Sequence, residues 1–297
     1  MSKTKKGAVG IIGLGIMGGA FARNLAAAGW PVTGFDIDPA RCAELSEAGV
    51  GIAPDVAALA QSAPTIITSL PTPKALEQVA REIAAVKGKK LVVAEMSTFA
   101  LEDKAKAEKV LADAGHVLLD CPVSGTGAQA KLKDLVVYAS GERASIAALR
   151  PLFADFSRQA HDLGAFGNGS RMKYIANLLV AIHNVAAAEA LVLGMKAGLN
   201  AQKVFDVIST SAGTSRMFEV RGPMMVAGEY DEATMRVAMW QKDLDIIGAF
   251  AKALGSPTPT FDATLPVYAA ALAAGYGAQD TGAVCAVLEQ QAGVKRA

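Results

Sequence analysis

A glycine-rich loop near the N-terminus constrains the fold more than any other feature of this sequence. The apolar run Val9–Gly13 is typical of a short buried strand, and a helical segment is expected at Gly18–Ala28. Between them lies the loop Gly13-Leu14-Gly15-Ile16-Met17-Gly18. A strand, a G-x-G-x-x-G loop and a helix in that order predict a dinucleotide site, because glycines let the backbone approach a pyrophosphate at the helix N-terminus.

An acidic residue closes the second predicted strand, Trp30–Asp36. A carboxylate at Asp36 can accept hydrogen bonds from the adenosine ribose hydroxyls, and it would repel a 2′-phosphate. The next residue is Ile37, not an arginine, and Arg41 is expected on the exposed face of the following helix, Pro39–Ala48. The sequence therefore favours NAD over NADP as the cofactor.

The N-terminal half of the chain alternates short β-like runs with alanine-rich helical stretches. Further strands are expected at Thr65–Ser69, Leu91–Met96, Val117–Leu119 and Leu135–Ala139. Strands that alternate with helices imply right-handed crossovers and a parallel sheet covered on both faces. The expected fold is an α/β Rossmann-type doubly wound parallel sheet.

A long helical segment without proline, Asn168–Lys196, follows this half of the chain. At ~1.5 Å per residue it would span on the order of 40 Å, which suits a helix that joins two domains, and Gly198 follows as a helix stop. Later helices are expected at Ala201–Ser209, Tyr230–Leu254, Phe261–Ala274 and Asp280–Gln291. We therefore expect a dinucleotide-binding domain over residues 1–166 and an all-helical substrate and oligomerisation domain over residues 167–297.

The composition supports large hydrophobic cores and argues against some partners. Hydrophobic residues make up 52% of the chain and charged residues 19%. The formal net charge is +1 and no basic face stands out, so we expect no nucleic-acid partner. The basic run Lys3–Lys6 is interpreted as a solvated tail. The longest apolar stretch, Leu178–Met195, is interrupted by polar residues such as Asn184, which predicts a core helix and no membrane association.

The cysteines and histidines bear on location and metal content. An odd number of distant cysteines argues for a reducing compartment; they are Cys42, Cys121 and Cys285. Because no secretory signal is evident, the expected location is cytoplasmic. The three histidines show no metal-ligand spacing, so no metal site is expected.

Four further segments join the glycine-rich loop in one recognisable pattern. They are Glu95-Met96-Ser97-Thr98, Asp120-Cys121-Pro122-Val123-Ser124-Gly125, Gly167-Asn168-Gly169-Ser170-Arg171-Met172-Lys173-Tyr174-Ile175-Ala176-Asn177 and Lys242-Asp243-Leu244. In order and spacing, over nearly the whole chain, they resemble the β-hydroxyacid dehydrogenase family. That family includes 3-hydroxyisobutyrate dehydrogenase and tartronate semialdehyde reductase.

The resemblance implies both an architecture and a reaction. It implies a Rossmann domain like the NAD-binding domain of 6-phosphogluconate dehydrogenase, then a helical domain, with the active site in the cleft between them. The implied activity is NAD(P)-dependent, with NAD preferred. It is hydride transfer between the cofactor and a small 3-hydroxy acid such as 3-hydroxyisobutyrate, glycerate or threonate.

Site residues follow from the same resemblance. The nicotinamide side of the cofactor would be lined by Leu70, Pro71 and Thr98. The carboxylate substrate would be bound by Ser124, Gly125 and Thr126. Lys173 would be the catalytic acid–base residue and Asn177 would position the substrate. Lys242 would close the site over the cofactor and the substrate.

The local pattern agrees with these roles but also allows a structural interpretation. Lys173 and Asn177 are four residues apart and share one face of the long helix, and Asn184 falls on nearly the same stripe. Polar groups on an alanine-rich helix are costly to bury without partners, which agrees with a functional stripe once the family resemblance is taken into account. The alternative is that Lys173 is an ordinary solvated lysine near a helix start.

Three positions depart from the family pattern. Thr126 stands where a glycine is usual, Leu178 replaces a second asparagine, and Lys133 occupies a position that is often a turn glycine. None of these departures removes a catalytic group. Thr126 narrows the expected site and adds a hydroxyl, so it bears on substrate choice.

Other functions and the assembly state are also considered. The alternatives are a non-catalytic NAD-binding sensor or scaffold and a reductase of a small semialdehyde or imine; Lys173 argues against the imine reductase. The small residues Ala186, Ala187, Ala188 and Ala190 would let another helix approach closely. We therefore expect a homodimer or homotetramer, the alternative being that these alanines pack only within the subunit.

Overall fold

The computed structural model describes residues 6–296 of the chain, which divides into two compact units, Met1–Lys173 and Tyr174–Ala297. Of the basic run Lys3–Lys6, only Lys6 lies within the described residues. Its ammonium is 2.6 Å from a carboxylate oxygen of Asp155 and lies over the ring of Trp30. Lys6 therefore packs on the first unit and is not part of a solvated tail.

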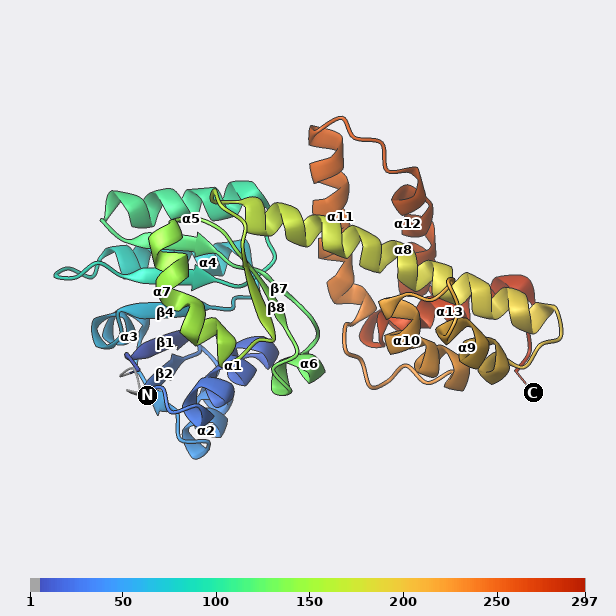
Figure 1. The fold of residues 1–297 in the computed structure, drawn as a ribbon, viewed down its shortest axis with the longest axis horizontal. Coiled ribbons are helices and arrows are strands. Elements are labelled where there is room, and N and C mark those ends of the chain that lie inside the picture. Colours follow the sequence, from blue (N-terminus) through green and yellow to red (C-terminus); the bar gives the residue numbers. More distant parts are fainter. Residues whose placement is uncertain (1–5, 297) are drawn as a thin grey trace. The chain divides into compact units, whose positions relative to one another are not determined.

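The first unit is built on a six-stranded parallel sheet in the order β3-β2-β1-β4-β5-β6. Figure 1 labels its neighbouring strands β2, β1 and β4. Its strands are β1 (Val9–Ile12), β2 (Val32–Phe35), β3 (Gly51–Ile52), β4 (Thr65–Thr68), β5 (Val92–Glu95) and β6 (Val117–Asp120). The chain starts in the middle, winds outward to β3, and then returns to place β4 on the other side of β1. In such sheets the point of reversal is where dinucleotides bind.

Helices cover both faces of this sheet, as the alternating sequence predicts. One core joins the sheet to α1 (Ile16–Ala27), α2 (Pro39–Glu47) and α7 (Arg143–Ala154). The opposite core joins it to α3 (Val56–Ser62), α4 (Pro73–Ala84) and α5 (Leu101–Asp113). All four residues of β1 are buried, because a central parallel strand faces helices on both sides.

A small second sheet extends this unit beyond the predicted parallel one. It contains β7 (Val123–Ser124), β8 (Val136–Ala139) and β9 (Gln159–Asp162), and α6 (Gly127–Lys131) lies between β7 and β8. The pairing of β7 with β8 is antiparallel, whereas β8 and β9 are parallel. Strands β3, β7 and β9 were not predicted, because β3 and β7 have only two residues each and β9 is polar.

The long helix α8 (Asn168–Lys196) has the predicted bounds, and Gly198 beyond it adopts the left-handed conformation of a helix stop. Among residues 6–296, α8 is the one helix long and apolar enough to cross a membrane. Its central residues instead form the core of the second unit, and Ala181, Ala188 and Leu191 are fully buried there. The two compact units divide after Lys173, inside α8. The first turn of α8 is bound to the first unit by hydrogen bonds.

The described part of the second unit is helical. After α8 come α9 (Ala201–Ser209), α10 (Arg216–Ala227), α11 (Val237–Ala253), α12 (Pro259–Ala273) and α13 (Val284–Ala292), with short 3₁₀ turns at Tyr276–Ala278 and Thr281–Ala283. The predicted helix Tyr230–Leu254 was wrong at its start, because Thr234 and Met235 are held by the carboxylate of Asp280. Helix α10 was not predicted, since Gly222 and Pro223 interrupt its sequence pattern.

Candidate active site

Two of the three loop glycines are required by the packing of the protein itself. Gly13 has φ +88°, and a Cβ there would lie 2.2 Å from the carbonyl oxygen of Ser69. A Cβ on Gly18 would lie 1.8 Å from the carbonyl oxygen of Gly13. Gly15 has no such constraint, since a Cβ there would meet only the guanidinium of Arg41 at 3.3 Å. The space at Gly15 is therefore of the kind that close approach of a ligand requires.

The N-terminus of α1 can receive an anion. Gly15 caps this helix without a side-chain hydrogen bond, and the first turn carries no acidic residue. The N–H groups of that turn and the helix dipole give the site a partial positive charge. A pyrophosphate is the ligand that this arrangement of backbone donors and glycines fits, so the residues present are suited to a dinucleotide.

Asp36 lies at the end of β2 and organises the glycine-rich loop. One oxygen of its carboxylate accepts a hydrogen bond from the N–H of Leu14 at 2.7 Å, and the other accepts one from the N–H of Asp38 at 2.9 Å. The guanidinium of Arg41 lies 3.4 Å from the same carboxylate. Arg41 is exposed on α2, as expected, and its guanidinium also faces Asp36.

The residues assigned to the nicotinamide side follow β4 and β5. Leu70 and Thr98 are partly buried and Pro71 is exposed. The loops that contain them are joined, because the N–H of Leu70 donates to the hydroxyl of Ser97 at 2.8 Å. The neighbouring strands β4 and β5 thus end in a connected pair of loops.

The segment assigned to the substrate follows β6 and includes β7. Ser124 is partly buried, and Gly125 has φ +131° with no room for a Cβ, which would lie 2.4 Å from the Leu135 side chain. Thr126 is the N-cap of α6, and it forms a capping box with Gln129. Its backbone N–H donates to the Gln129 amide oxygen at 3.0 Å. The structure therefore gives the Thr126 hydroxyl a local structural role.

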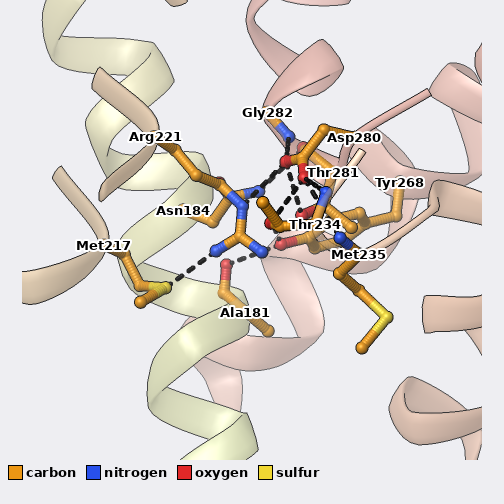
Figure 2. Close-up of polar contacts among 10 residues, drawn as sticks. All are labelled: Ala181, Asn184, Met217, Arg221, Thr234, Met235, Tyr268, Asp280, Thr281 and Gly282. Atoms are coloured by element: carbon orange, nitrogen blue, oxygen red, sulfur yellow. Dashed lines mark hydrogen bonds and ion pairs between the residues drawn. The ribbon is translucent and has the colours of Figure 1, made fainter. Parts of the chain in front are cut away.

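The polar stripe predicted on α8 divides into parts with different surroundings. Lys173 is partly buried, and Asn177 on the next turn is 4% exposed. Asn184 is also buried, and its amide donates to the hydroxyl of Tyr268 at 3.1 Å and to the carbonyl of Thr281 at 2.9 Å (Figure 2). Asn184 is therefore a core residue, while Lys173 and Asn177 remain the candidates for chemistry on this helix.

Lys242 lies on α11, in the second unit. Its ammonium is 3.4 Å from a carboxylate oxygen of the neighbouring Asp243, and its side chain is 45% exposed. The start of α11 is fixed by an isolated β-bridge between Arg236 and Asp280.

A buried ion pair in the second unit escaped the sequence analysis. The guanidinium of Arg221 donates to the carboxylate of Asp280 at 2.9 Å, and both side chains are buried (Figure 2). The same carboxylate accepts hydrogen bonds from Thr234, Met235 and Gly282. Burial opposes ionisation, but Arg221 and these donors outweigh it and lower the pKa of Asp280. The pair fixes the segment that leads into α11, and a lone arginine and aspartate carry no spacing that predicts it.

Comparison with known proteins gives the family. Residues 8–165 match the model of the NAD-binding domain of 6-phosphogluconate dehydrogenase, and residues 167–288 match the model of the NAD-binding domain of NADP-dependent 3-hydroxyisobutyrate dehydrogenase. Relatives named L-threonate dehydrogenase occur in several bacteria; that of Escherichia coli strain K12 is 34% identical over 93% of each chain. The chain belongs to the β-hydroxyacid dehydrogenase family.

Solved structures agree with this assignment. The 3-hydroxyisobutyrate dehydrogenase from Salmonella typhimurium superposes with a TM-score of 0.85 and 32% identity, covering 95% of this chain and 100% of that one. The Mycobacterium tuberculosis 3-hydroxyisobutyrate dehydrogenase, in a structure described as including L-serine, has a TM-score of 0.87 and 26% identity, covering 96% and 99%. The β-hydroxyacid dehydrogenase family and the Rossmann-plus-helical fold predicted from the sequence are confirmed.

One departure from the family pattern has a visible backbone consequence. Lys133, which occupies a position that is often glycine in β-hydroxyacid dehydrogenases, has φ +61°. Among residues 6–296 it is the one non-glycine residue with positive φ. Its N–H donates to the carbonyl of Ala130 at 3.2 Å, so this left-handed residue ends α6 where a glycine would serve more easily.

Proposed function

We propose that this hydroxyacid dehydrogenase uses NAD and oxidises a small 3-hydroxy acid, with threonate as the first candidate substrate and Lys173 as the acid–base residue. The observation that carries the proposal is that Lys173 and the substrate segment are anchored by one carboxylate. Asp120 begins the segment that leads to Ser124, and it binds both the N–H and the hydroxyl of Ser170, one helical turn before Lys173.

The relatives support the substrate class. Threonate, 3-hydroxyisobutyrate and L-serine, which appear in the relatives' names and descriptions, share a carboxylate and a hydroxyl on the third carbon. A small substrate of this kind needs one protein group that binds its carboxylate and another that accepts or donates the proton of its hydroxyl. Ser124 with its neighbouring N–H groups suits the first task, and Lys173 suits the second.

The proposed chemistry divides between cofactor and protein. NAD, held at Gly13–Gly18 and Asp36 and flanked by Leu70, Pro71 and Thr98, supplies the hydride acceptor when bound. The neutral amine of Lys173 accepts the proton of the substrate hydroxyl as oxidation proceeds, and in the reverse direction its ammonium returns that proton. Asn177, on the same face of α8 as Lys173, would orient the substrate, and Lys242 would be a further substrate-binding residue.

The preference for NAD rests on the charge of Asp36. A carboxylate repels a 2′-phosphate, and the hydrogen bonds from Leu14 and Asp38 keep it in place. Arg41 would favour NADP, but it is paired with both Asp36 and Asp38. The three unpaired cysteines and the core packing of α8 support a cytoplasmic enzyme.

A substrate screen with both cofactors tests the proposal. The purified protein is assayed with NAD and NADP over threonate, 3-hydroxyisobutyrate, glycerate, 3-hydroxypropionate, serine and 4-hydroxybutyrate. The proposal requires turnover of at least one 3-hydroxy acid, with a higher kcat/KM for NAD. Binding of NAD without turnover of any of these, or of the matching semialdehydes, would instead indicate a sensor or scaffold.

A further inference from the structure

Three fully buried ionisable side chains meet at the carboxyl ends of β5 and β6. Glu95 and Asp120 are register partners on these adjacent strands, so their carboxylates lie side by side. Lys104, from α5, places its ammonium 2.6 Å from an oxygen of Glu95 and 2.8 Å from an oxygen of Asp120. The relative exposure of all three side chains is 0%. Burial of such charges costs several kcal/mol per ion before pairing, so stability alone does not explain their presence.

The Glu95 side of this cluster shapes the loops assigned to the nicotinamide. The second carboxylate oxygen of Glu95 accepts a hydrogen bond from the N–H of Ser97 at 2.9 Å. The hydroxyl of Ser97 in turn accepts the N–H of Leu70 at 2.8 Å. Glu95 is therefore connected, through one serine, to the two loops that contain Leu70 and Thr98.

The Asp120 side holds the first turn of α8. The Asp120 carboxylate accepts the N–H and the hydroxyl of Ser170, each at 2.7 Å. The hydroxyl of Ser140, 3.2 Å from the same carboxylate, accepts the N–H of Gly169 at 2.9 Å. These bonds cap a helix start whose N–H groups have no partner within the helix. Lys173 lies three residues after Ser170, on the following turn.

The helix start is also pressed against the sheet. A Cβ on Gly169 would lie 2.3 Å from the carbonyl oxygen of Tyr138 and 2.6 Å from that of Asp120. The first turn of α8 therefore has little freedom to shift while the carboxylate of Asp120 stays in place. The position of that carboxylate depends in turn on Lys104.

The ammonium is what keeps two neighbouring carboxylates together. Burial disfavours the charged amine, but the carboxylates of Glu95 and Asp120 outweigh it and raise the pKa of Lys104. The cluster then carries one net negative charge, which the partial positive charge at the N-terminus of α8 stabilises. Without the ammonium, two buried carboxylates would repel each other at the junction of the two hydrogen-bonded segments.

We propose that Lys104 is a positioning residue that keeps the loops at Leu70 and Thr98 in register with the helix turn that carries Lys173. The proposal rests on the function proposed above, because it assigns these two segments to the cofactor and to proton transfer. The glycine-rich loop belongs to β1, which is separated from β5 by β4. Loss of Lys104 therefore acts on the chemical step and leaves dinucleotide binding largely intact.

Replacement of the buried ammonium tests this directly. In Lys104→Met we expect kcat to fall about 10–100-fold, as small misplacements of reacting groups do, while the Kd for NAD changes less than about threefold. In the free protein, amide hydrogen exchange should rise together in residues 96–99 and 168–172, with no change in α1. Lys106→Met, on the exposed side of the same helix, is the matched control and should leave both readouts unchanged.

A second variant separates positioning from stability. Glu95→Gln/Lys104→Met restores one net negative charge, so its thermal stability should recover toward wild type. Its kcat and its protection at residues 96–99 and 168–172 should stay below wild type, because no ammonium joins the two carboxyl positions. If Lys104→Met fails to fold, the double variant still tests whether Lys104 positions the two segments.

Two results would overturn the proposal. One is a Lys104→Met protein with a lowered Tm but wild-type kcat and exchange at both segments. The other is full recovery of kcat and protection in the double variant, which would show that Lys104 only balances charge. If the wild-type protein turns over no substrate, the proposed function fails, while the exchange measurements still decide whether Lys104 couples the two segments.

Discussion

The guanidinium of Arg41 lies 3.4 Å from the carboxylate of Asp36, the residue whose charge is proposed to reject NADP. Asp36→Asn should relax that rejection, because it removes the charge but leaves an oxygen that can accept the Leu14 N–H. Arg41 then becomes available to a phosphate, and the ratio of kcat/KM for NADP to that for NAD should rise about 10–100-fold, as expected for hydrogen bonds to a charged group.

Adding Arg41→Ala supplies the control for this prediction. The gain with NADP should disappear in Asp36→Asn/Arg41→Ala, since the guanidinium that would receive the phosphate is gone. A wild-type protein that already uses NADP as efficiently as NAD would contradict the preference itself.

Replacement of Lys173 is expected to remove proton transfer. Lys173→Ala should lower kcat by about 10²–10⁴-fold, the usual contribution of a general acid–base group, with little change in NAD affinity measured by fluorescence titration. Lys173→Arg should not restore activity, because arginine does not act as a base near neutral pH.

Lys242→Ala is the informative comparison. If Lys242 has only the proposed binding role, this variant should weaken substrate binding without removing the proposed proton acceptor. Near-normal turnover in Lys173→Ala together with loss of activity in Lys242→Ala would show that the wrong lysine carries the chemistry.

The Arg221–Asp280 pair predicts an acid-sensitive second unit. Because the pKa of Asp280 is lowered from its ordinary value of 3.8, its stabilising contribution is present above that value and is lost as pH falls through the lower folded-state value. Asp280→Asn should cost roughly 3–5 kcal/mol near neutral pH, since it leaves a buried guanidinium without its partner. Urea unfolding from pH 7 to pH 2 should show a smaller acid dependence in the variant than in wild type.

Relief of the left-handed backbone at Lys133 should stabilise the first unit. A left-handed conformation costs a non-glycine residue about 1–2 kcal/mol, and a glycine avoids this cost. Part of the gain is lost, because glycine has more conformational freedom in the unfolded chain and loses more entropy on folding. Lys133→Gly should therefore raise the unfolding free energy by roughly 0.5–1 kcal/mol. Lys131→Gly, inside α6, should lower it by a similar amount, and calorimetry of both variants checks the sign.

We propose a homodimer or homotetramer, with contact through the outer face of α8. Ala187 and Ala188 are buried within the unit, whereas Ala186 and Ala190 are exposed beside Leu193. Ala190→Arg should shift the mass measured by light scattering toward that of the 30.5 kDa chain. A wild-type protein of that mass at micromolar concentration would reject the proposal.

Sequence patterns predicted what depends on local chemistry and periodicity. The glycine-rich loop, the carboxylate of Asp36 and the bounds of α8 all follow from spacing along the chain. The two-residue strands were not predicted, because their pairing is set by tertiary contacts and not by an apolar repeat. The ion pair between Arg41 and Asp36 was not predicted either, because a position on a helix does not determine where a long side chain points.

The buried charged residues were the part of the structure that the sequence predicted least well. Lys104 reads as one more lysine on a charged helix, and nothing in its neighbours marks it as a fully buried residue. Its partners, Glu95 and Asp120, lie on two different strands. Only the parallel register, which aligns the ends of β5 and β6, brings the three side chains together.

The capping of α8 from a distance has a consequence for folding order. The N–H groups at its start are bound by Asp120 and Ser140, which lie 50 and 29 residues earlier in the chain than their helical partners. A helix with a local cap can nucleate early. The first turn of α8 instead gains its hydrogen-bond partners only when the ends of β6 and β8 are in place. The position of the lysine proposed to move the proton is thus defined by the ends of two strands, one from each sheet of the first unit.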